Sequence, residues 1–426
     1  MINILEGIRV VETASFFMGP IAGRILADWG AEVIKIETAT SVPPHDGDRV
    51  RGTGMARGIV NGDPCCNEFV NGNKKSVGIN TFVPAGRKLQ QELCASADIV
   101  IHHMRPQDAK KLGLDYATLS AKNPGIIVAC TSGYGLKGPV ASRGGFDATA
   151  YAARSGMVTD CTSDGKPFIP FMGYGDVPAG TYLATAILAA YVNKLKTGKG
   201  EEVTTALYGS AIWTAGIPIM TAQYGDKYPT PREAVFPTTK AFKCADGKYI
   251  YLMGQVWESV IDGLCKIMDM PKGAKKKWPN YFAASASNAE ITAILDEQFI
   301  QHDRDYWEEK LATTKIPFEI VNSFADVQKD EQAWKAGFLV KPEDSPYETG
   351  IPVAPGHFKS QGDVEVKTVN VGENTREQLK ELGYSDEKID GLRSKGVISE
   401  GDQFESDRFD ITKPGTYYNK VFSQLK

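Results

Sequence analysis

The chain has 426 residues, of which 42% are hydrophobic and 23% charged, and its formal net charge is −4. This length predicts two or three domains with a large core, and the composition is typical of globular domains. The slightly acidic balance excludes charge-driven recruitment of nucleic acid or of an anionic membrane. The longest nearly apolar run, 179–192, is too short to span a bilayer, and the first residues lack the cationic start of a secretion signal. We therefore expect a cytoplasmic protein that binds neither nucleic acid nor membrane.

The first 130 residues alternate between strand and helix patterns. Short, largely β-branched runs over 7–11, 31–36, 75–80, 98–101 and 125–129 predict strands, and helical patterns follow the first and third runs, over about 21–30 and 84–96. Strands separated by helices indicate a parallel sheet covered on both faces, so we predict a doubly wound, Rossmann-like α/β domain. The turn after the first strand lacks G-x-G-x-x-G, which argues against a bound dinucleotide.

Further along the chain the pattern changes. Helices are predicted over 177–194 and about 207–224, and a hairpin with an Asp246-Gly247 turn follows. Ser287 and Glu290 have the spacing of a capping box before another helix. We expect a separate α+β domain over 226–325.

The seven cysteines and five histidines show no metal-binding spacing. No C-x-x-C, H-E-x-x-H or H-x₃-H pattern occurs, so we expect no metal site. The neighbouring Cys65 and Cys66 admit a redox or metal role, but thiols of a reducing compartment are the simpler interpretation.

One carboxylate has an unusual context. Asp176 follows Gly173-Tyr174-Gly175 and directly precedes the helix predicted over 177–194. The structural interpretation is a helix N-cap. The functional interpretation is a nucleophile for an activated acyl group, which the helix N-terminus keeps ionised and the flanking glycines leave accessible. The residues alone leave both open.

Several motifs, taken together, resemble family III coenzyme A transferases. They are LEGIRVVE (5–12), MGPIAGRILADWGAEVIKIE (18–37), NGNKKSV (71–77), ADIVIHHMRPQDAKKLGLDY (97–116), SGYGLKGP (132–139), GGFDATAY (144–151), GDVPAG (175–180), TGKGEEV (197–203) and ELGYSDEKI (381–389). The resemblance covers almost the whole chain. It is greatest to the branch from anaerobic amino-acid fermenters, which moves CoA between an acyl- or 2-enoyl-CoA and a 2-hydroxy acid such as 2-hydroxyisocaproate or phenyllactate.

The resemblance implies a mechanism and an assembly. The nucleophilic aspartate of the family falls on Asp176, which would carry CoA as an aspartyl thioester, so that a CoA thioester is a substrate and no tightly bound cofactor is needed. The family forms interlocked homodimers, in which both chain ends build the large domain and the smaller one is inserted. This implies a large domain of 1–225 and 326–426, whose first part binds CoA, around the inserted domain 226–325.

The resemblance also implies binding residues. For CoA these are Phe17, Met18, Lys35, His103, Arg105, Lys111, Gly144, Gly145, Phe146 and Asp147. Lys111 stands where the family usually has arginine, which keeps the charge but loses bidentate phosphate geometry. The segment 231–239 replaces a glycine-rich loop that shields the intermediate in oxalate-type members.

The residues expected to line the substrate pocket are largely aromatic. They are Phe16, Tyr151, Phe171 and Met172, which suit a branched-chain or aryl 2-hydroxy acid, although aromatic side chains are more often simple core. A bile acid or another bulky hydrophobic carboxylate is an alternative acceptor.

The residues argue against two other functions. The α-methylacyl-CoA racemases of the same fold family use the histidine of a G-H-D motif, and here Phe146 in Gly145-Phe146-Asp147 has no transferable proton. Asp147 would then be a helix cap or a residue supporting the site. A non-catalytic binder of CoA esters would have no need for the carboxylate of Asp176.

Overall fold

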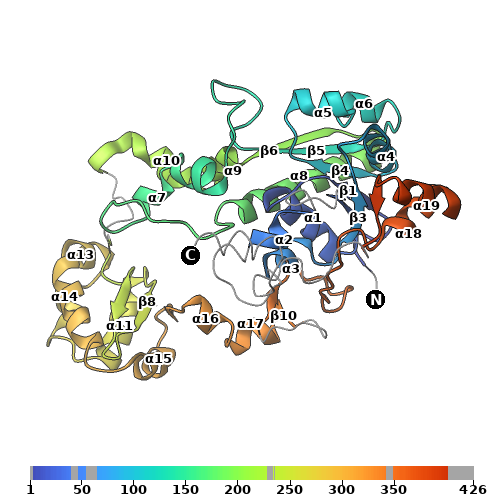
Figure 1. Cartoon of the computed structure of the whole chain (residues 1–426). Coiled ribbons are helices and arrows are strands. Elements are labelled where there is room, and N and C mark those ends of the chain that lie inside the picture. The colour runs from blue at the N-terminus through green and yellow to red at the C-terminus, as the bar shows by residue number, and fades with distance from the viewer. Residues whose placement is uncertain are drawn as a thin grey trace, which may run out of the picture. The chain divides into compact units, whose positions relative to one another are not determined.

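The computed structural model describes residues 3–39, 47–53, 65–227, 234, 236–341 and 349–401 (Figure 1). The chain forms two compact units. The large unit comprises Met1–Val158, Ile169–Gly216 and Glu331–Lys426, and the small unit comprises Thr159–Phe168 and Ile217–Asp330. Both units are therefore discontinuous in the sequence.

A seven-stranded sheet organises the large unit. Its order is β12-β3-β2-β1-β4-β5-β6, and all neighbouring strands are parallel except β12, which runs antiparallel to β3. The strands are β1 (Arg9–Glu12), β2 (Glu32–Thr38), β3 (Lys75–Ile79), β4 (Ile99–His102), β5 (Ile127–Ser132), β6 (Glu202–Ala206) and β12 (Ile398–Ser399). The strand order reverses between β1 and β4, as in doubly wound folds. The prediction of an α/β fold with a predominantly parallel sheet is confirmed.

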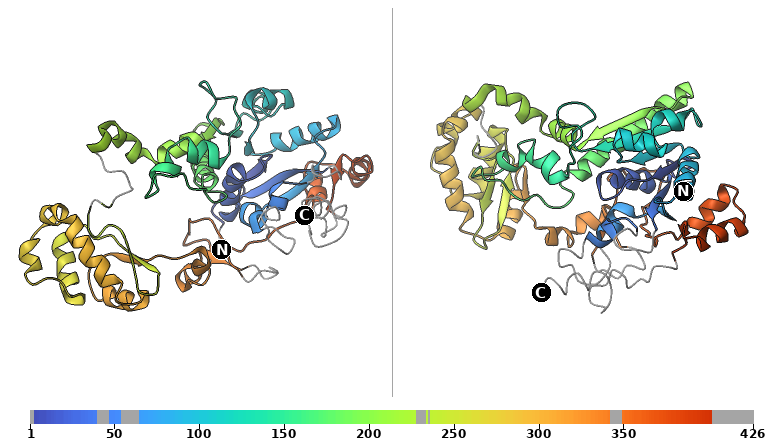
Figure 2. Two further views of the ribbon diagram at one scale, coloured as in Figure 1. Left: turned by 60° about the vertical axis from the view of Figure 1, so that its left-hand side comes forward. Right: turned by 45° about the horizontal axis from the view of Figure 1, so that its top comes forward.

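Helices lie on both faces of this sheet (Figures 1 and 2). The helices of the large unit are α1 (Met18–Asp28), α2 (Val50–Thr53), α3 (Cys65–Asn71), α4 (Pro84–Ala95), α5 (Pro106–Leu112), α6 (Tyr116–Ser120), the π-helix η2 (Asp147–Ala153), α8 (Asp176–Thr197), α9 (Leu207–Thr214), α17 (Glu331–Lys335), α18 (Thr375–Glu381) and α19 (Asp386–Ser394), while α7 (Met157–Asp160) begins there. A short hairpin, β10 (Leu339–Val340) and β11 (Ile351–Pro352), completes it.

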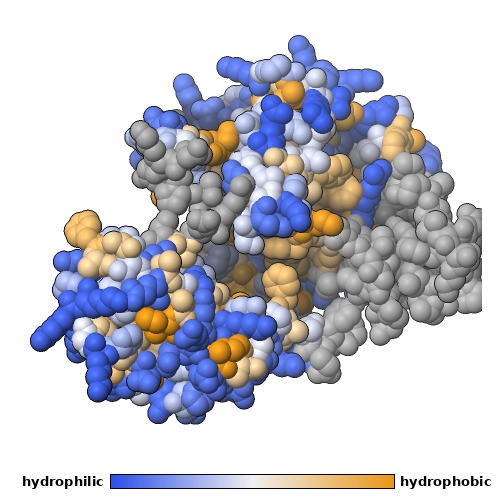
Figure 3. All heavy atoms as spheres, turned by 90° about the vertical axis from the view of Figure 1, so that its left-hand side faces the viewer, coloured by the Kyte–Doolittle hydropathy of each residue, from blue (hydrophilic) through white to orange (hydrophobic). Residues whose placement is uncertain are grey.

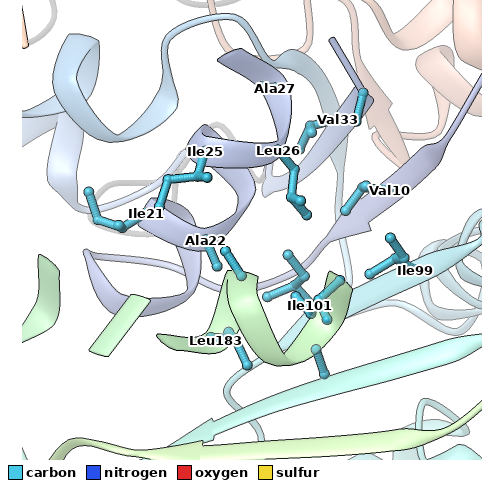
Figure 4. Close-up of a cluster of buried hydrophobic side chains, with 14 of the residues drawn as sticks. Val10, Ile21, Ala22, Ile25, Leu26, Ala27, Val33, Ile99, Ile101 and Leu183 are labelled. Carbon is cyan, nitrogen blue, oxygen red and sulfur yellow. The ribbon is translucent and has the colours of Figure 1, made fainter. Parts of the chain in front are cut away.

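Two apolar layers separate the helices from the sheet, because successive strand residues point to opposite faces. Val10 and Ile99 face one layer, where α1 and α8 pack through residues such as Ile21 and Leu183 (Figure 4). The next residues along these strands, such as Val11, face the other layer with α4, α6, α18 and α19. Because both faces are covered, the central strands are buried along nearly their whole length.

The outer edge of β3 is closed by the C-terminal part of the chain. Ile398 of β12 pairs with Ile79. The backbone N–H groups of Ser76 and Gly78 donate hydrogen bonds of 3.0 Å to the side chains of Asn374 and Thr375. Residues some 300 positions later in the sequence therefore supply hydrogen-bond partners for the outer edge of β3.

The small unit has its own core around a three-stranded antiparallel sheet, β7 (Ala241–Lys243), β8 (Tyr249–Leu252) and β9 (Phe318–Ile320). Its helices are α10 (Gly216–Thr221), which begins at the last residue of the large unit, η3 (Ala222–Lys227), α11 (Trp257–Ile267), α12 (Ala274–Lys277), α13 (Tyr281–Ala286), α14 (Asn288–Phe299), α15 (Arg304–Ala312) and α16 (Phe324–Val327). Trp257, Trp278 and Trp307 anchor the core. The predicted hairpin at Gly247 is confirmed, with Gly247 at a φ of 80°.

Two local predictions are wrong. The helix expected over 207–224 is broken into α9, α10 and η3, because Gly216 and Pro218 interrupt the helical pattern. Ser287 does precede α14, but its side chain makes no capping hydrogen bond.

The face of the molecule in Figure 3 is mostly hydrophilic, with apolar side chains exposed in separate places. Among the described residues, no helix is long and apolar enough to cross a membrane.

Candidate active site

A cavity of about 570 Å³ lies at the carboxyl ends of β1, β4 and β5. Its wall consists of Ser15, Phe16, Phe17, Met18, Gly19, His103, Met104, Arg105, Pro106, Thr131, Ser132, Gly133, Leu136, Ala141, Arg143, Gly144, Gly145, Phe146, Asp147, Met172, Asp176 and Leu207. The cavity thus lies where the strand order reverses, which is the usual ligand position in open α/β sheets.

The turn after β1 supplies an aromatic wall. Phe16 has a left-handed backbone with a φ of 67°, which is uncommon for a bulky residue. Its N–H donates a hydrogen bond of 3.0 Å to Asp48 Oδ1, which helps to hold the turn. The Phe16 ring meets the Phe146 ring edge to face at 6.4 Å between centroids. Two apolar side chains from distant segments thereby meet at the wall.

A buried ion cluster of Glu12, Lys35, Asp48 and Lys74 supports this turn. Lys35 Nζ lies 2.7 Å from Glu12 and 2.8 Å from Asp48, and Lys74 Nζ lies 2.9 Å from Glu12. The two carboxylates raise the pKa of Lys35 despite its burial, whereas burial lowers the pKa of Lys74 to about 8. Lys35, expected to bind CoA, is 2% exposed and is not on the wall of the 570 Å³ cavity. It lines a separate pocket of about 240 Å³.

Asp176 is the first residue of α8, after a turn that Gly173 enters with a φ of 87°. Gly175 is the N-cap residue, so the interpretation of Asp176 as an N-cap is wrong. No group among the described residues donates a hydrogen bond to the Asp176 carboxylate. Burial, with a contribution from the charge of Asp147, raises its pKa to about 7. Burial therefore acts against the ionised form that the helix N-terminus is expected to favour.

His103 lies on the walls of both the 570 Å³ cavity and the 240 Å³ pocket. Its Nδ1 accepts a hydrogen bond of 3.3 Å from the Ser15 backbone N–H. Burial lowers the pKa of His103, and the charge of Lys35 lowers it further. A neutral imidazole that accepts at Nδ1 carries its proton on Nε2 and can donate there.

Most of the residues predicted for the site line the cavity. They are Phe16, Phe17, Met18, His103, Arg105, Gly144, Gly145, Phe146, Asp147, Met172 and Asp176. Four others do not. Lys35 is in the ion cluster, Lys111 is exposed on α5, Tyr151 is buried behind Gly175, and Phe171 is 54% exposed outside the wall.

The prediction missed wall residues at the carboxyl end of β5, notably Ser132, the last residue of that strand, and it also missed Arg143. The rule that ligands bind at strand carboxyl ends would have found the first group. Arg143 directly precedes the predicted Gly144, but no spacing marks it. Residues 231–233 and 235 of the segment 231–239, and the side chain of Cys65, lie outside the described residues. Over the described ranges, no group of three or more His, Cys, Asp or Glu could hold a metal ion.

Comparison with known proteins places the chain in a family. Residues 5–369 match the model of CoA-transferase family III. The chain is 36% identical to the (R)-2-hydroxy-4-methylpentanoate CoA-transferase of Clostridioides difficile over 403 residues. This alignment covers 93% of this chain and 99% of the relative. The chain is 34% identical to the cinnamoyl-CoA:phenyllactate CoA-transferase of Clostridium sporogenes, over 92% and 96% of the two chains.

A solved structure agrees with these sequence matches. The crystal structure of a CAIB/BAIF family protein from Brucella suis superposes with a TM-score of 0.74 at 26% identity, covering 90% of this chain and 100% of that one. The chain belongs to CoA-transferase family III. It is an enzyme that uses a CoA thioester as substrate.

Proposed function

We propose that this enzyme moves CoA from an acyl- or enoyl-CoA to a bulky hydrophobic 2-hydroxy acid through an aspartyl-CoA thioester on Asp176. The observation that carries the proposal is the position of Asp176. Its carboxylate lines a 570 Å³ cavity at the carboxyl ends of the strands, with a pKa raised to about 7 and no hydrogen-bond donor among the described residues. An ionised carboxylate with a raised pKa is a stronger nucleophile than an ordinary one.

The proposed reaction balances without any further reactant. An Asp176 oxygen attacks the donor thioester carbon, and the carbon–sulfur bond breaks to give a mixed anhydride and CoA thiolate. The thiolate then attacks the aspartyl carbonyl carbon of the anhydride and releases the donor acid as a carboxylate. The acceptor carboxylate reverses both steps and regenerates the free Asp176 carboxylate. Each step conserves an activated acyl bond.

The wall offers stabilisation for the negative charge that develops. Met18 and Gly19, in the first turn of α1, lie on the wall, and no side chain in the described part of the chain caps this helix. The first backbone N–H groups of a helix have no partner within it and form the positive end of its dipole. We propose that the N–H groups of this turn stabilise the oxyanion that forms on the reacting carbonyl group. Arg105 and Arg143 supply positive charge for the substrate carboxylate or the CoA phosphates.

The acceptor class follows from the wall and from the relatives. Apolar side chains of Phe16, Phe17, Met18, Leu136, Phe146, Met172 and Leu207 line the cavity. They suit an aliphatic or aryl side chain better than oxalate. The two relatives at 34–36% identity are named for 2-hydroxy acids, whereas the formyl-CoA:oxalate CoA-transferase of Escherichia coli is 26% identical.

The acceptor is tested by competition. With one acyl-CoA donor, we expect 2-hydroxy-4-methylpentanoate and phenyllactate to be used much faster than oxalate or glutarate. A preference for oxalate contradicts the pocket assignment, and a preference for a bile acid identifies the alternative acceptor class.

The covalent intermediate is tested by intact mass after mixing with a short acyl-CoA. We expect an adduct that hydroxylamine removes and that maps to the peptide containing Asp176. The variant Asp176→Asn should form no adduct, whereas Asp108→Asn, at an exposed aspartate of α5, should form it as the wild type does. Absence of the adduct from wild-type protein that binds CoA would exclude this mechanism.

Racemisation remains the alternative reaction and predicts a different result. It needs two proton-transferring groups beside the acyl α-carbon, and Phe146 supplies none. Exchange of solvent deuterium into the acyl chain without CoA transfer would support the racemase. The proposal also includes an interlocked homodimer in the cytoplasm, for which light scattering and cell fractionation are the measurements.

A further inference from the structure

The π-helix η2 holds the turn before Asp176 at two points. Asp147, its first residue, accepts through Oδ2 a hydrogen bond of 2.9 Å from the Gly173 backbone N–H. Farther along η2, Tyr151 packs so closely on Gly175 that a Cβ atom there would lie 2.4 Å from the Tyr151 Cγ. Short π-helices occur frequently at functional sites. The turn that carries Asp176 therefore has a fixed position relative to η2.

Asp147 also brings a second carboxylate to the same cavity. Its charge raises the pKa of Asp176 above the value that burial alone would give. Two like charges at one site favour any state in which one of them is neutral. In the reaction proposed above, Asp176 becomes neutral whenever it is bonded to an acyl carbon or to the CoA sulfur.

We propose that Asp147 is a positioning residue that also tunes the charge of Asp176: its hydrogen bond to Gly173 aims the Asp176 carboxylate, and its negative charge favours acylated Asp176 over the free carboxylate. This inference rests on the proposed function. When the Asp176 oxygen bonds to the acyl carbon, the carbon–sulfur bond breaks and the negative charge leaves with the CoA thiolate. No proton, oxidant or other reactant is needed.

Other charged or titratable side chains line the cavity or pack on the turn. They are His103, Arg105, Arg143, Tyr151 and Tyr174. Farther away, the Tyr182 hydroxyl shares Thr214 as a hydrogen-bond partner with the Tyr151 hydroxyl. Burial lowers the pKa of His103 and raises that of Tyr151, so each favours its neutral form. The two arginines bring positive charge that opposes the effect of Asp147. The arginines contribute equally in the wild type and in an Asp147 variant. The difference between these two proteins therefore reports the effect of the Asp147 carboxylate alone.

The test uses two substitutions that separate the roles of Asp147. Asp147→Asn keeps an oxygen acceptor for the Gly173 N–H and removes the charge, whereas Asp147→Ala removes both. Asp108→Asn is the matched control, because it removes an exposed carboxylate elsewhere in the large unit. Asp147→Ser, which also keeps an oxygen without charge, replaces D147N if that variant fails to fold.

The readouts are the acidic midpoint in the pH profile of kcat/KM for the acyl-CoA donor and the level of the hydroxylamine-sensitive adduct. We expect D147N to move the midpoint to lower pH by about one unit and to lower the adduct level about tenfold. D147A should show the same shift and, in addition, a lower kcat from the misplaced carboxylate. D108N should leave the midpoint unchanged.

Two outcomes overturn the inference in distinguishable ways. A wild-type adduct together with an unmoved midpoint in D147N overturns the role of Asp147 alone. No adduct in the wild type overturns the proposed function and this inference with it.

Discussion

Replacing Asp176 by asparagine should make the protein more stable at alkaline pH. The folded protein raises the pKa of this carboxyl from 3.8 to about 7, so it holds the proton more tightly than the unfolded chain does. The free energy of unfolding of the wild type therefore falls as pH rises from about 4 to about 7, and it stays low above that range. At about 1.4 kcal/mol for each pH unit, the loss is about 4 kcal/mol at most. Asparagine never ionises and avoids this loss.

The assay is urea and thermal unfolding of wild type and D176N at several values of pH. We expect the variant to be more stable above the folded pKa by up to about 4 kcal/mol and equal to the wild type below about pH 4. D108N, which removes an exposed carboxylate, should show no such dependence. If D176N is no more stable than the wild type at alkaline pH, or if its advantage persists in acid, burial of the charge is not the origin of the raised pKa.

Two further substitutions test the support of the site. Gly175→Ala should abolish transfer and cost about 1–3 kcal/mol, because its Cβ would lie 2.4 Å from the Tyr151 Cγ. Transferase assays and melting curves check this. The control is Gly209→Ala inside α9, where the nearest atom is 3.9 Å away; it should melt no lower than the wild type, because alanine suits a helix better than glycine. Lys35→Met should cost about 3–5 kcal/mol, because it removes the buried ammonium group that pairs with Asp48 and leaves Glu12 with Lys74 alone. Urea unfolding measures the loss, and an unchanged midpoint would show that the cluster contributes no stability.

The parallel sheet was predictable because its central strands carry their own signal. Runs of β-branched residues mark β1 to β5, and the predicted strand at 75–80 and helix at 84–96 agree with β3 and α4 to within one residue. β6 was missed because Glu202–Ala206 is largely polar and none of its residues is fully buried. β12 has only two residues and pairs with a strand about 320 positions away, which no local pattern shows. The predicted domain boundaries at 225 and 325 remain predictions.

The sequence allowed most residues of the candidate site to be predicted, but not their pKa values or ion pairs. Glycines around Asp176 marked it as accessible, but its pKa depends on burial and on Asp147, which only the tertiary structure brings near. Lys35 was expected to reach CoA, yet it sits in the middle of a strand covered on both faces. Such a lysine must pair with buried carboxylates, so its position in the strand could have corrected the expectation.

The closure of β3 by β12 has a consequence for synthesis on the ribosome. β3 leaves the exit tunnel about 320 residues before the strand that pairs with its outer edge, an interval of about 15–60 s at ordinary elongation rates. During that time the growing polypeptide presents an unpaired β edge, which is a template for association with other chains. The discontinuous large unit can complete its fold only after Ile398 and Ser399 have left the exit tunnel. We therefore expect holdase chaperones to bind most strongly to nascent chains stalled before Ile398, in which the outer edge of β3 is still unpaired.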